Sequence, residues 1–250
     1  MTNKFRYFIA NWKMFGNLSS LKSIDNVIKY VKSNPKKKFK LIYCPPYTLL
    51  QSFHIKLKKT KINLGAQNCH EETNYGPFTG KINSKMIKSL GAKYVIIGHS
   101  ENRQDGENDS LINKKIISAL KNKLSVIFCV GETLSQKRIK LTRKILMKQL
   151  SVGLKNVPIN SNIIIAYEPV WSIGTGLIPK KLDLSQNIDF IKAQVKKKLK
   201  FKNIKIIYGG SVNPNNIAGL NLIDSIDGYL IGGASQSSKK LIDILRKSVI

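Results

Sequence analysis

Short apolar segments alternate with longer amphipathic segments from one end of the chain to the other. The apolar segments are rich in β-branched and aromatic residues and are hydrophobic almost throughout, which favours strands covered on both faces, as in a parallel sheet. They cover residues 5–10, 40–43, 62–66, 94–97, 125–130, 163–167, 205–208 and 228–231. The pattern therefore predicts eight buried parallel strands.

The segments between these strands place apolar residues three and four positions apart, which is the period of a helix with one buried face. They cover residues 18–31, 48–57, 84–90, 111–121, 138–150, 185–199, 215–220 and 239–247. Eight strand–helix units without a Ser/Gly-rich linker predict a single (β/α)₈ barrel domain over residues 1–250, a length typical of that fold. A doubly wound open sheet fits five or six such units more readily.

Polar and glycine-rich clusters directly follow most of the predicted strands. They are Asn11-Trp12-Lys13, Gln67-Asn68, Gly98-His99-Ser100-Glu101, Gly131-Glu132, Glu168-Pro169, Gly209-Gly210-Ser211 and Gly232-Gly233. In a (β/α)₈ barrel the carboxyl ends of the strands converge on one mouth, where active sites lie. We therefore expect these distant residues to meet in one pocket, whereas the alternative treats each cluster as an ordinary turn between a strand and a helix.

The charge of the chain is unusual, because 43 Lys and Arg residues against 14 Asp and Glu give a formal net charge of +29. This value raises the alternative of a barrel that binds nucleic acid or an anionic surface. Few of the basic residues are arginine, the residue on which base and phosphate recognition depends most. The lysines also occupy polar positions of predicted helices, so solvated outer faces are the favoured interpretation, and no dedicated nucleic-acid or membrane partner is expected.

The sequence lacks the usual signals for several other classes of protein. No apolar run approaches the roughly 18 residues of a membrane helix, and Asn11 and Lys13 interrupt the apolar N-terminal patch, so we expect a cytoplasmic protein. The three cysteines show no CxxC spacing, which argues against a disulfide framework or a zinc site. Nucleotide-binding glycine motifs and metal motifs are also absent from the sequence, so no cofactor and no metal are expected.

The segment "IIIAYEPVWSIGTG", residues 163–176, places a carboxylate, Glu168, directly after a predicted buried strand. A carboxylate in a dry pocket suits a general base near neutral pH. Pro169 restricts the backbone that follows, while Gly174 and Gly176 permit conformations that other residues resist. This composition predicts a lid that moves as a unit and excludes water when closed. The alternative is a glutamate that caps a strand before a structural turn.

Of the three histidines, only His99 directly follows a predicted strand. Ser100 can cap the helix that begins there, and a helix N-terminus near the imidazole disfavours the cation, which leaves a neutral ring able to polarise a carbonyl. Lys13, which follows Asn11 at the end of the first strand, would need an anion or a carboxylate to neutralise it. Glu101 is a candidate partner for that lysine.

The last two strand–helix units contain the glycine pairs of "YGGSV" and "IGGAS". In barrels of this kind the loops after the seventh and eighth strands form the usual phosphate site. The glycines of these loops, such as Gly232 and Gly233, allow backbone N–H groups to approach phosphate oxygens, and Ser211 adds a hydroxyl group. A base, a neutral electrophile, a cation and a phosphate site are suited to moving a proton next to a carbonyl.

Seven motifs of this sequence resemble the triosephosphate isomerase family, in the family's order and over essentially the whole chain: "NWKM", "GAQNC", "GHSE", "CVGETL", "AYEPVWSIGTG", "YGGSV" and "GYLIGGAS". The resemblance implies that Glu168 takes the proton beside the carbonyl of dihydroxyacetone phosphate and that His99 polarises this carbonyl. It implies that Lys13 stabilises negative charge and that Asn11 orients the substrate. The phosphate-binding residues that it implies are Gly174, Ser211, Gly232 and Gly233.

The resemblance also implies a homodimer, in which the loop from Asn68 to Gly80 enters the neighbouring subunit and brings Thr79 near its active site. The sequence departs from the family pattern at three places. Asn102 precedes Arg103 where two arginines are usual, the segment up to Glu107 is one residue shorter, and "GLIPKK" replaces the usual lid hinge. These departures bear on subunit affinity, stability and lid opening rather than on the proton-transfer groups.

Overall fold

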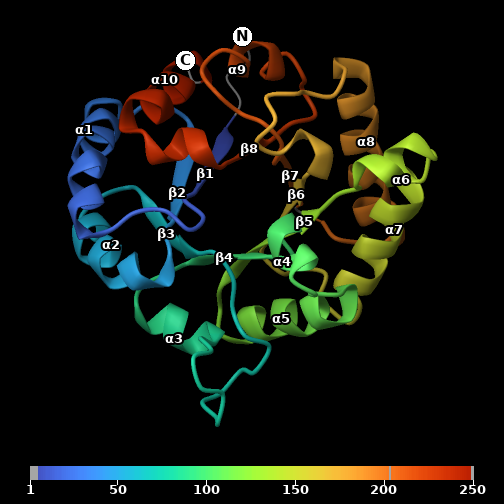
Figure 1. The fold of residues 1–250 in the computed structure, drawn as a ribbon, viewed down its shortest axis with the longest axis horizontal. Helices are drawn as coiled ribbons and strands as arrows, with labels where there is room; N and C mark the ends of the chain where they lie inside the picture. The colour runs from blue at the N-terminus through green and yellow to red at the C-terminus, as the bar shows by residue number, and fades with distance from the viewer. Residues whose placement is uncertain (1–4, 203, 249–250) are drawn as a thin grey trace.

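The fold, taken from a computed structural model that describes residues 5–202 and 204–248, is a closed barrel (Figure 1). Within these residues eight parallel strands pair in chain order, and β8 pairs back onto β1. The strands are β1 (Arg6–Asn11), β2 (Phe39–Cys44), β3 (Asn63–Ala66), β4 (Tyr94–Ile97), β5 (Ser125–Val130), β6 (Ile163–Tyr167), β7 (Lys205–Tyr208) and β8 (Gly228–Ile231). The prediction of eight parallel strands in a (β/α)₈ barrel is confirmed, and every strand end lies within one residue of its predicted position.

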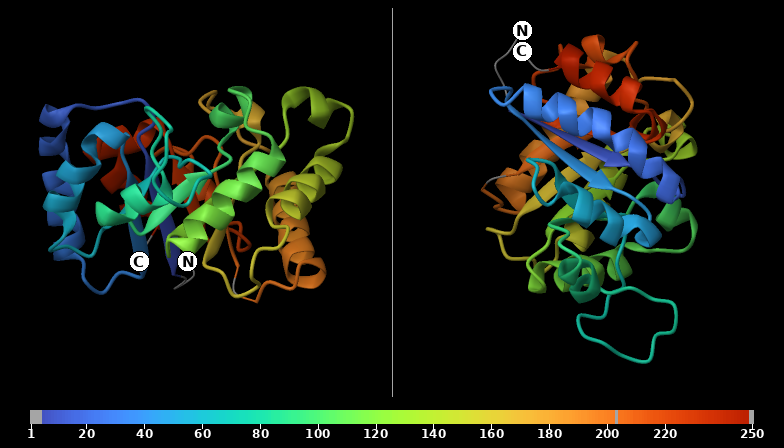
Figure 2. Two further views of the ribbon diagram at one scale, coloured as in Figure 1. Left: turned by 90° about the horizontal axis from the view of Figure 1, so that it is seen from below. Right: turned by 90° about the vertical axis from the view of Figure 1, so that its left-hand side faces the viewer.

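The helices form a ring around the strands, as Figures 1 and 2 show. They are α1 (Ile24–Ser33), α2 (Leu50–Leu57), α3 (Ser84–Ser89), α4 (Ser100–Gln104), α5 (Asp109–Lys121), α6 (Leu134–Arg138), α7 (Thr142–Gly153), α8 (Lys181–Ala193), α9 (Ile217–Leu220) and α10 (Ser238–Ser248). Strands at the centre and helices outside are the layers that the two hydrophobic periods predict.

Most predicted helices differ by one to a few residues at an end, and three differ more. The predicted helix at residues 18–31 opens with a 3₁₀ turn, Leu18–Ser23, before α1. The predicted helix at residues 138–150 is interrupted because Lys140 adopts a left-handed backbone with φ of 58°, so α6 ends before α7 begins. The predicted helix at residues 185–199 starts earlier, at Lys181, and ends in a π-helical turn.

Buried apolar side chains on both faces of the strands hold the barrel. Along β1, Ile9 joins Ile42, Ile127 and Ile207 in a cluster inside the barrel, whereas its neighbour Phe8 joins the larger cluster between strands and helices. Each fully buried isoleucine contributes about 1.5–3 kcal/mol. The strand ends therefore form a rigid platform for the residues that follow them.

Two features outside this core bear on function. The segment between β3 and α3 projects from the body of the barrel, at the bottom of Figure 1 and in the right view of Figure 2. Arg103 joins the ends of β4 and β5, because its guanidinium donates to the carbonyl oxygens of Gly98 and Cys129 and pairs with Asp109 at 2.6 Å. Arg103, which follows Asn102, thus holds the ends of these two strands together.

Candidate functional site

A cavity of about 460 Å³ opens at the carboxyl ends of the strands. Eight residues that the sequence predicts for a site all line it: Asn11, Lys13, His99, Glu168, Gly174, Ser211, Gly232 and Gly233. The expected convergence is therefore present for these eight residues but not for all of the predicted clusters, because Glu132 lines a second hollow and Gln67 and Asn68 line a third. Other residues on its wall were not singled out from the sequence, namely Ile173, Asn213, Pro214, Asn215, Leu230, Ala234 and Lys240.

Glu168 follows β6 and is held deep in this cavity, with only 1% of the residue exposed. Its backbone N–H donates to the carbonyl oxygen of Val130 at 2.8 Å, which continues the pairing of β5 and β6 past the end of the strands. Its Oε2 accepts the backbone N–H of Ser100 at 3.2 Å. Its Oε1 has no hydrogen-bond partner among the described residues. One carboxylate oxygen is thus fixed and the other is free to accept a proton.

His99 lies beside this carboxylate, with its Nε2 3.4 Å from Oε1 of Glu168. Its Nδ1 accepts the backbone N–H of Glu101 at 3.2 Å, so His99 itself is the N-cap of α4. The expectation that Ser100 caps this helix is wrong, because the side chain of His99 makes the capping hydrogen bond and Ser100 is the first residue of α4. A ring nitrogen that accepts a hydrogen bond carries no proton, so a neutral His99 bears its proton on Nε2.

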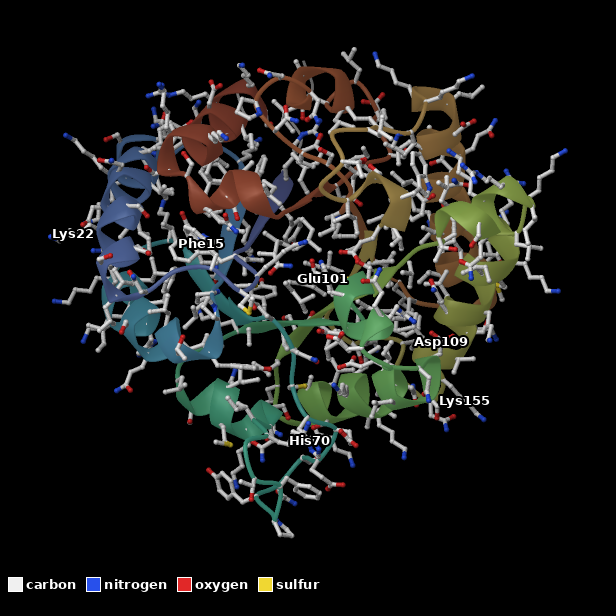
Figure 3. All side chains as sticks on the ribbon, viewed as in Figure 1. Phe15, Lys22, His70, Glu101, Asp109 and Lys155 are labelled. Atoms are coloured by element: carbon white, nitrogen blue, oxygen red, sulfur yellow. The ribbon has the colours of Figure 1, made fainter. Side chains whose placement is uncertain are left out.

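Lys13 reaches the site from the end of β1 in a left-handed backbone conformation, with φ of 56°. Its ammonium pairs with Oε1 of Glu101 at 2.5 Å, so the carboxylate partner suggested by the sequence is present. In Figure 3 Glu101 lies near the centre of the ring of strands. The backbone N–H of Lys13 donates to the side chain of Asn11, and its carbonyl oxygen accepts from Gln67 at 2.9 Å. Gln67 thus holds the backbone of Lys13, and the sequence pointed to Gln67 only through its place after a strand.

The loops after β7 and β8 form another part of the cavity wall, next to Glu168 and Lys13: a Cβ at Gly209 would lie 2.7 Å from Cγ of Glu168, and one at Gly232 would lie 3.4 Å from Cε of Lys13. Gly210, Ser211, Gly232 and Gly233 lie on its wall, and a 3₁₀ turn begins at Gly233. A Cβ at Gly233 would meet no atom within 4 Å, so open space lies next to this backbone. Backbone N–H groups at such a turn, with space before them, suit an anion.

The segment after Glu168 carries the features expected of a lid. Gly174 and Gly176 have φ values of 72° and 79°, and both are exposed. The indole N–H of Trp171 donates to Oε1 of Glu132 at 2.9 Å, and the ammonium of Lys137 lies 3.5 Å from the centroid of the Trp171 ring. Burial raises the pKa of Glu132, although the hydrogen bond from Trp171 acts in the opposite direction. These contacts fix the beginning of the lid, while its glycines lie free at the surface.

Elsewhere in the described part of the chain, the metal-binding side chains and the cysteines form no second site. Among residues 5–202 and 204–248, no group of three or more His, Cys, Asp or Glu side chains is arranged to hold a metal ion. The cysteines Cys44, Cys69 and Cys129 are free and buried. The same residues contain no helix long and apolar enough to cross a membrane.

A carboxylate, an imidazole and an ammonium at the mouth of a (β/α)₈ barrel, beside two glycine-rich loops, are typical of a class of barrel enzymes that move protons on small anionic substrates. Comparison with known proteins narrows the class. The family model for triosephosphate isomerase matches residues 6–248. The chain belongs to the triosephosphate isomerase family, whose members are isomerases.

Individual relatives agree along nearly the whole chain. The triosephosphate isomerase of Geotalea uraniireducens is 39% identical over 96% of this chain and 97% of its own. The triosephosphate isomerase of Chlamydia muridarum is 39% identical over 98% of this chain and 92% of its own. The crystal structure of triosephosphate isomerase from Bartonella henselae superposes with a TM-score of 0.87 at 35% identity and covers 97% of this chain and 98% of that one.

Proposed function

We propose that the chain interconverts dihydroxyacetone phosphate and D-glyceraldehyde 3-phosphate without a cofactor. The observation that supports this most is the free Oε1 of Glu168, 3.4 Å from Nε2 of His99 in a cavity that ends in a glycine and serine loop pair. The family membership supplies the substrate class. The alternative of a basic nucleic-acid or surface-binding barrel has no specific observation in its favour.

In this proposal the Glu168 carboxylate takes a proton from the carbon that bears the hydroxyl group, next to the carbonyl. The electron pair of the broken C–H bond forms the C=C bond of an enediolate, and the carbonyl oxygen gains negative charge. The Nε2–H of His99 donates to that oxygen, and the Lys13 ammonium stabilises its charge. His99 then gives its Nε2 proton to that oxygen and takes the proton of the other hydroxyl group, so that a carbonyl forms on the first carbon when protonated Glu168 returns its proton to the neighbouring carbon. Only protons change place, so electrons balance without an oxidant or a reductant.

The phosphate group would bind in the same cavity to the backbone of Gly174, Gly232 and Gly233 and to Ser211. Because this group does not react, its binding energy can drive closure of the lid. Closure excludes water from Glu168 and strengthens the interactions of the enediolate with His99 and Lys13. Asn11, buried beside Lys13, would help to orient the substrate.

We also propose that the chain forms a homodimer through the loop from Asn68 to Gly80. This loop projects from the barrel (Figure 2) and exposes 68% of Tyr75 and 43% of Phe78. Beside its base lies a hollow of about 590 Å³, lined in part by the buried ion pair of Glu107 and Lys115. Oε2 of Glu107 has no hydrogen-bond partner within the described part of the chain. A projecting loop with exposed aromatic side chains, and a hollow with an unsatisfied carboxylate, fit a dimer in which each subunit inserts this loop into the other. Thr79 of the partner subunit would then lie near the active site.

Two further properties complete the proposal. The strands of the barrel come from both ends of the described chain, from β1 to β8, which supports one domain over residues 1–250. The free state of all three cysteines suits a reducing compartment, so we propose a cytoplasmic location.

The activity is tested with purified protein in an assay coupled to NADH oxidation by glycerol-3-phosphate dehydrogenase. The unchanged protein is expected to turn over without an added cofactor, and Glu168→Gln, which keeps the shape and removes the base, should lose about 10³–10⁴-fold in kcat. A variant that retained near-normal turnover would contradict the role of Glu168. Light scattering after size exclusion should give twice the monomer mass of 28.1 kDa, and a Tyr75→Asp, Phe78→Asp double variant should be monomeric.

A further inference from the structure

The hydroxyl group of Ser172 is buried between the lid and the loop after β7. Ser172 is the last residue of a 3₁₀ turn, Val170–Ser172, and is fully buried. Its Oγ lies 2.7 Å from the carbonyl oxygen of Leu177 and 2.8 Å from the hydroxyl oxygen of Tyr208. The backbone N–H of Ser211 also donates to this Oγ, at 3.4 Å. One side chain therefore joins the beginning of the lid, a later part of the lid and the loop after β7.

The direction of these hydrogen bonds follows from the chemistry of the groups. A serine hydroxyl has one proton and two lone pairs. The carbonyl oxygen of Leu177 can only accept, so the proton of Ser172 is directed to it. The Tyr208 hydroxyl therefore donates to Ser172, and the Ser211 N–H takes the other lone pair. The hydroxyl of Ser172 is fully engaged by the protein, and Ser172 is not on the cavity wall, so it holds segments of the chain and does not contact the substrate.

The bond between Ser172 and Leu177 connects two parts of the lid to each other. The two lid glycines with positive φ, Gly174 and Gly176, lie between the bonded residues. The side-chain oxygen of Thr175 accepts the N–H of Leu177 at 3.2 Å, which adds a second bond within the same segment. Glycines lose much conformational freedom when they are ordered, so bonds on both sides of them are needed to keep the segment in one conformation.

The bond between Ser172 and Tyr208 connects the lid to the loop after β7. Tyr208 is the last residue of β7, and Gly210 and Ser211 follow it. A Cβ at Gly210 would lie 2.6 Å from Oγ of Ser172 and 2.2 Å from the hydroxyl oxygen of Tyr208. The backbone of this loop thus packs directly against the pair of hydroxyl groups, and the position of the lid is coupled to the position of Ser211.

We propose that Ser172 is a positioning residue whose hydroxyl group keeps the lid in one piece and joins it to the loop after β7, so that Gly174 and Ser211 are in place for the phosphate group. This inference rests on the proposed function, because it explains how two of the phosphate-binding residues are positioned. A ligand that finds its binding groups already ordered pays less conformational entropy on binding. Without the hydroxyl, the phosphate group has to order the lid and the loop as it binds.

The size of the effect follows from the bonds that are lost. Loss of one neutral hydrogen bond changes an equilibrium on the order of 3-fold, which corresponds to about 0.7 kcal/mol at 1.4 kcal/mol per tenfold change. Ser172→Ala removes the two short bonds, to Leu177 and to Tyr208, whereas the bond from Ser211 is long and adds little. The kcat/KM for D-glyceraldehyde 3-phosphate should therefore fall about 10-fold.

The test compares Ser172→Ala with Ser225→Ala. Ser225 lies just before β8, at the end of the barrel away from the cavity, and its buried Oγ has no hydrogen-bond partner in the described part of the chain. The control thus removes a buried hydroxyl group that holds nothing, and it should keep the normal constants. Ser172→Ala should also raise the inhibition constant of inorganic phosphate about 10-fold. With D-glyceraldehyde, which has no phosphate group to place, deuterium uptake from D2O measured by NMR should proceed at the normal kcat/KM.

A double-mutant cycle tests the link to Tyr208. In a Tyr208→Phe background only the bond to Leu177 remains to be lost, so Ser172→Ala should then lower kcat/KM about 3-fold instead of about 10-fold. A loss of equal size in both backgrounds would show that Ser172 does not act through Tyr208 and would overturn the assignment.

The outcomes separate this inference from the proposed function. If the unchanged protein turns over and Ser172→Ala either keeps the normal kcat/KM or loses the same factor with D-glyceraldehyde, the role of Ser172 is refuted and the proposed function stands. If the unchanged protein shows no isomerase turnover, the proposed function fails. Calorimetric titration with inorganic phosphate then decides the assignment, which is supported by weaker binding in Ser172→Ala than in Ser225→Ala and refuted by equal binding in both variants.

Discussion

The substitution Gly209→Ala tests whether the position of the Glu168 carboxylate sets the rate. A Cβ at Gly209 would lie 2.7 Å from Cγ of Glu168 and 3.3 Å from its Oε1. Carbon atoms pack at about 3.5–4.0 Å, so the carboxylate has to move by about 1 Å. The Glu168 side chain is buried and its Oε2 is held by the N–H of Ser100, so this movement must displace it from His99. A displacement of about 1 Å costs on the order of 10²-fold in rate.

The same substitution should affect stability only modestly. Overpacking costs about 1–3 kcal/mol, and replacing glycine with alanine recovers about 0.4–1 kcal/mol from the unfolded state. Gly209 is not among the residues with positive φ, so alanine adds no backbone strain there. A net loss of about 1 kcal/mol lowers Tm by about 2–4 °C.

The coupled assay and thermal unfolding are measured together, with Gly219→Ala as the control. A Cβ at Gly219 would approach only the end of Lys181, at 4.0 Å, and α9 favours alanine over glycine. We expect Gly209→Ala to lose about 10²-fold in kcat and a few degrees in Tm, and Gly219→Ala to keep its full rate. A Gly209→Ala protein with the normal kcat would show that the observed position of Glu168 does not govern catalysis.

Two further predictions concern buried titratable groups. Burial raises the pKa of the thiols of Cys44, Cys69 and Cys129, to about 12 for Cys69. A thiol reagent should therefore label none of them in the folded protein and all three after unfolding. Labelling in the folded state would contradict their burial. Burial raises the pKa of Glu132 above its ordinary 4.5, so the Glu132 carboxyl group holds its proton more tightly in the folded chain than in the unfolded chain. This group therefore contributes stability at acid pH, and the contribution is lost as the pH rises from about 4.5 through the raised pKa of the folded state. The Tm of the unchanged protein relative to Glu132→Gln should therefore fall from acid to neutral pH, and a difference independent of pH would refute this.

The strands could be predicted from the sequence because most of their residues are buried on both faces, so that each strand reads as a nearly continuous apolar run. The helix ends could not be predicted as well. Lys140 separates α6 from α7 because its φ is positive, and the sequence has no glycine or asparagine at this position to indicate such a conformation. The first turn of α8 begins at Lys181, where the Lys180 side chain makes no capping hydrogen bond, so the start of this helix lacks the usual N-cap residue.

The residue types of the site could be predicted, but the hydrogen bonds that each of these residues makes could not. The sequence places His99 and Ser100 at a helix start, and Ser100 is the cap that it predicts. The structure shows His99 as the cap and leaves the Ser100 N–H for Glu168. Likewise, Gln67 stands after β3 without a charge or a motif, and only the closed barrel brings its amide to the carbonyl oxygens of Lys13 and Cys44.

The high net charge also becomes interpretable only with the contacts. Carboxylates are scarce in this chain, at 14 against 43 basic residues, yet three of them pair with cations at the carboxyl ends of the strands or beside the projecting loop: Glu101 with Lys13, Asp109 with Arg103, and Glu107 with Lys115. A cation that is partly withdrawn from water needs such a partner, whereas a lysine on the outer face of a helix is solvated and does not. The excess positive charge can therefore accumulate on the outer helices while the pairs near the barrel mouth remain complete.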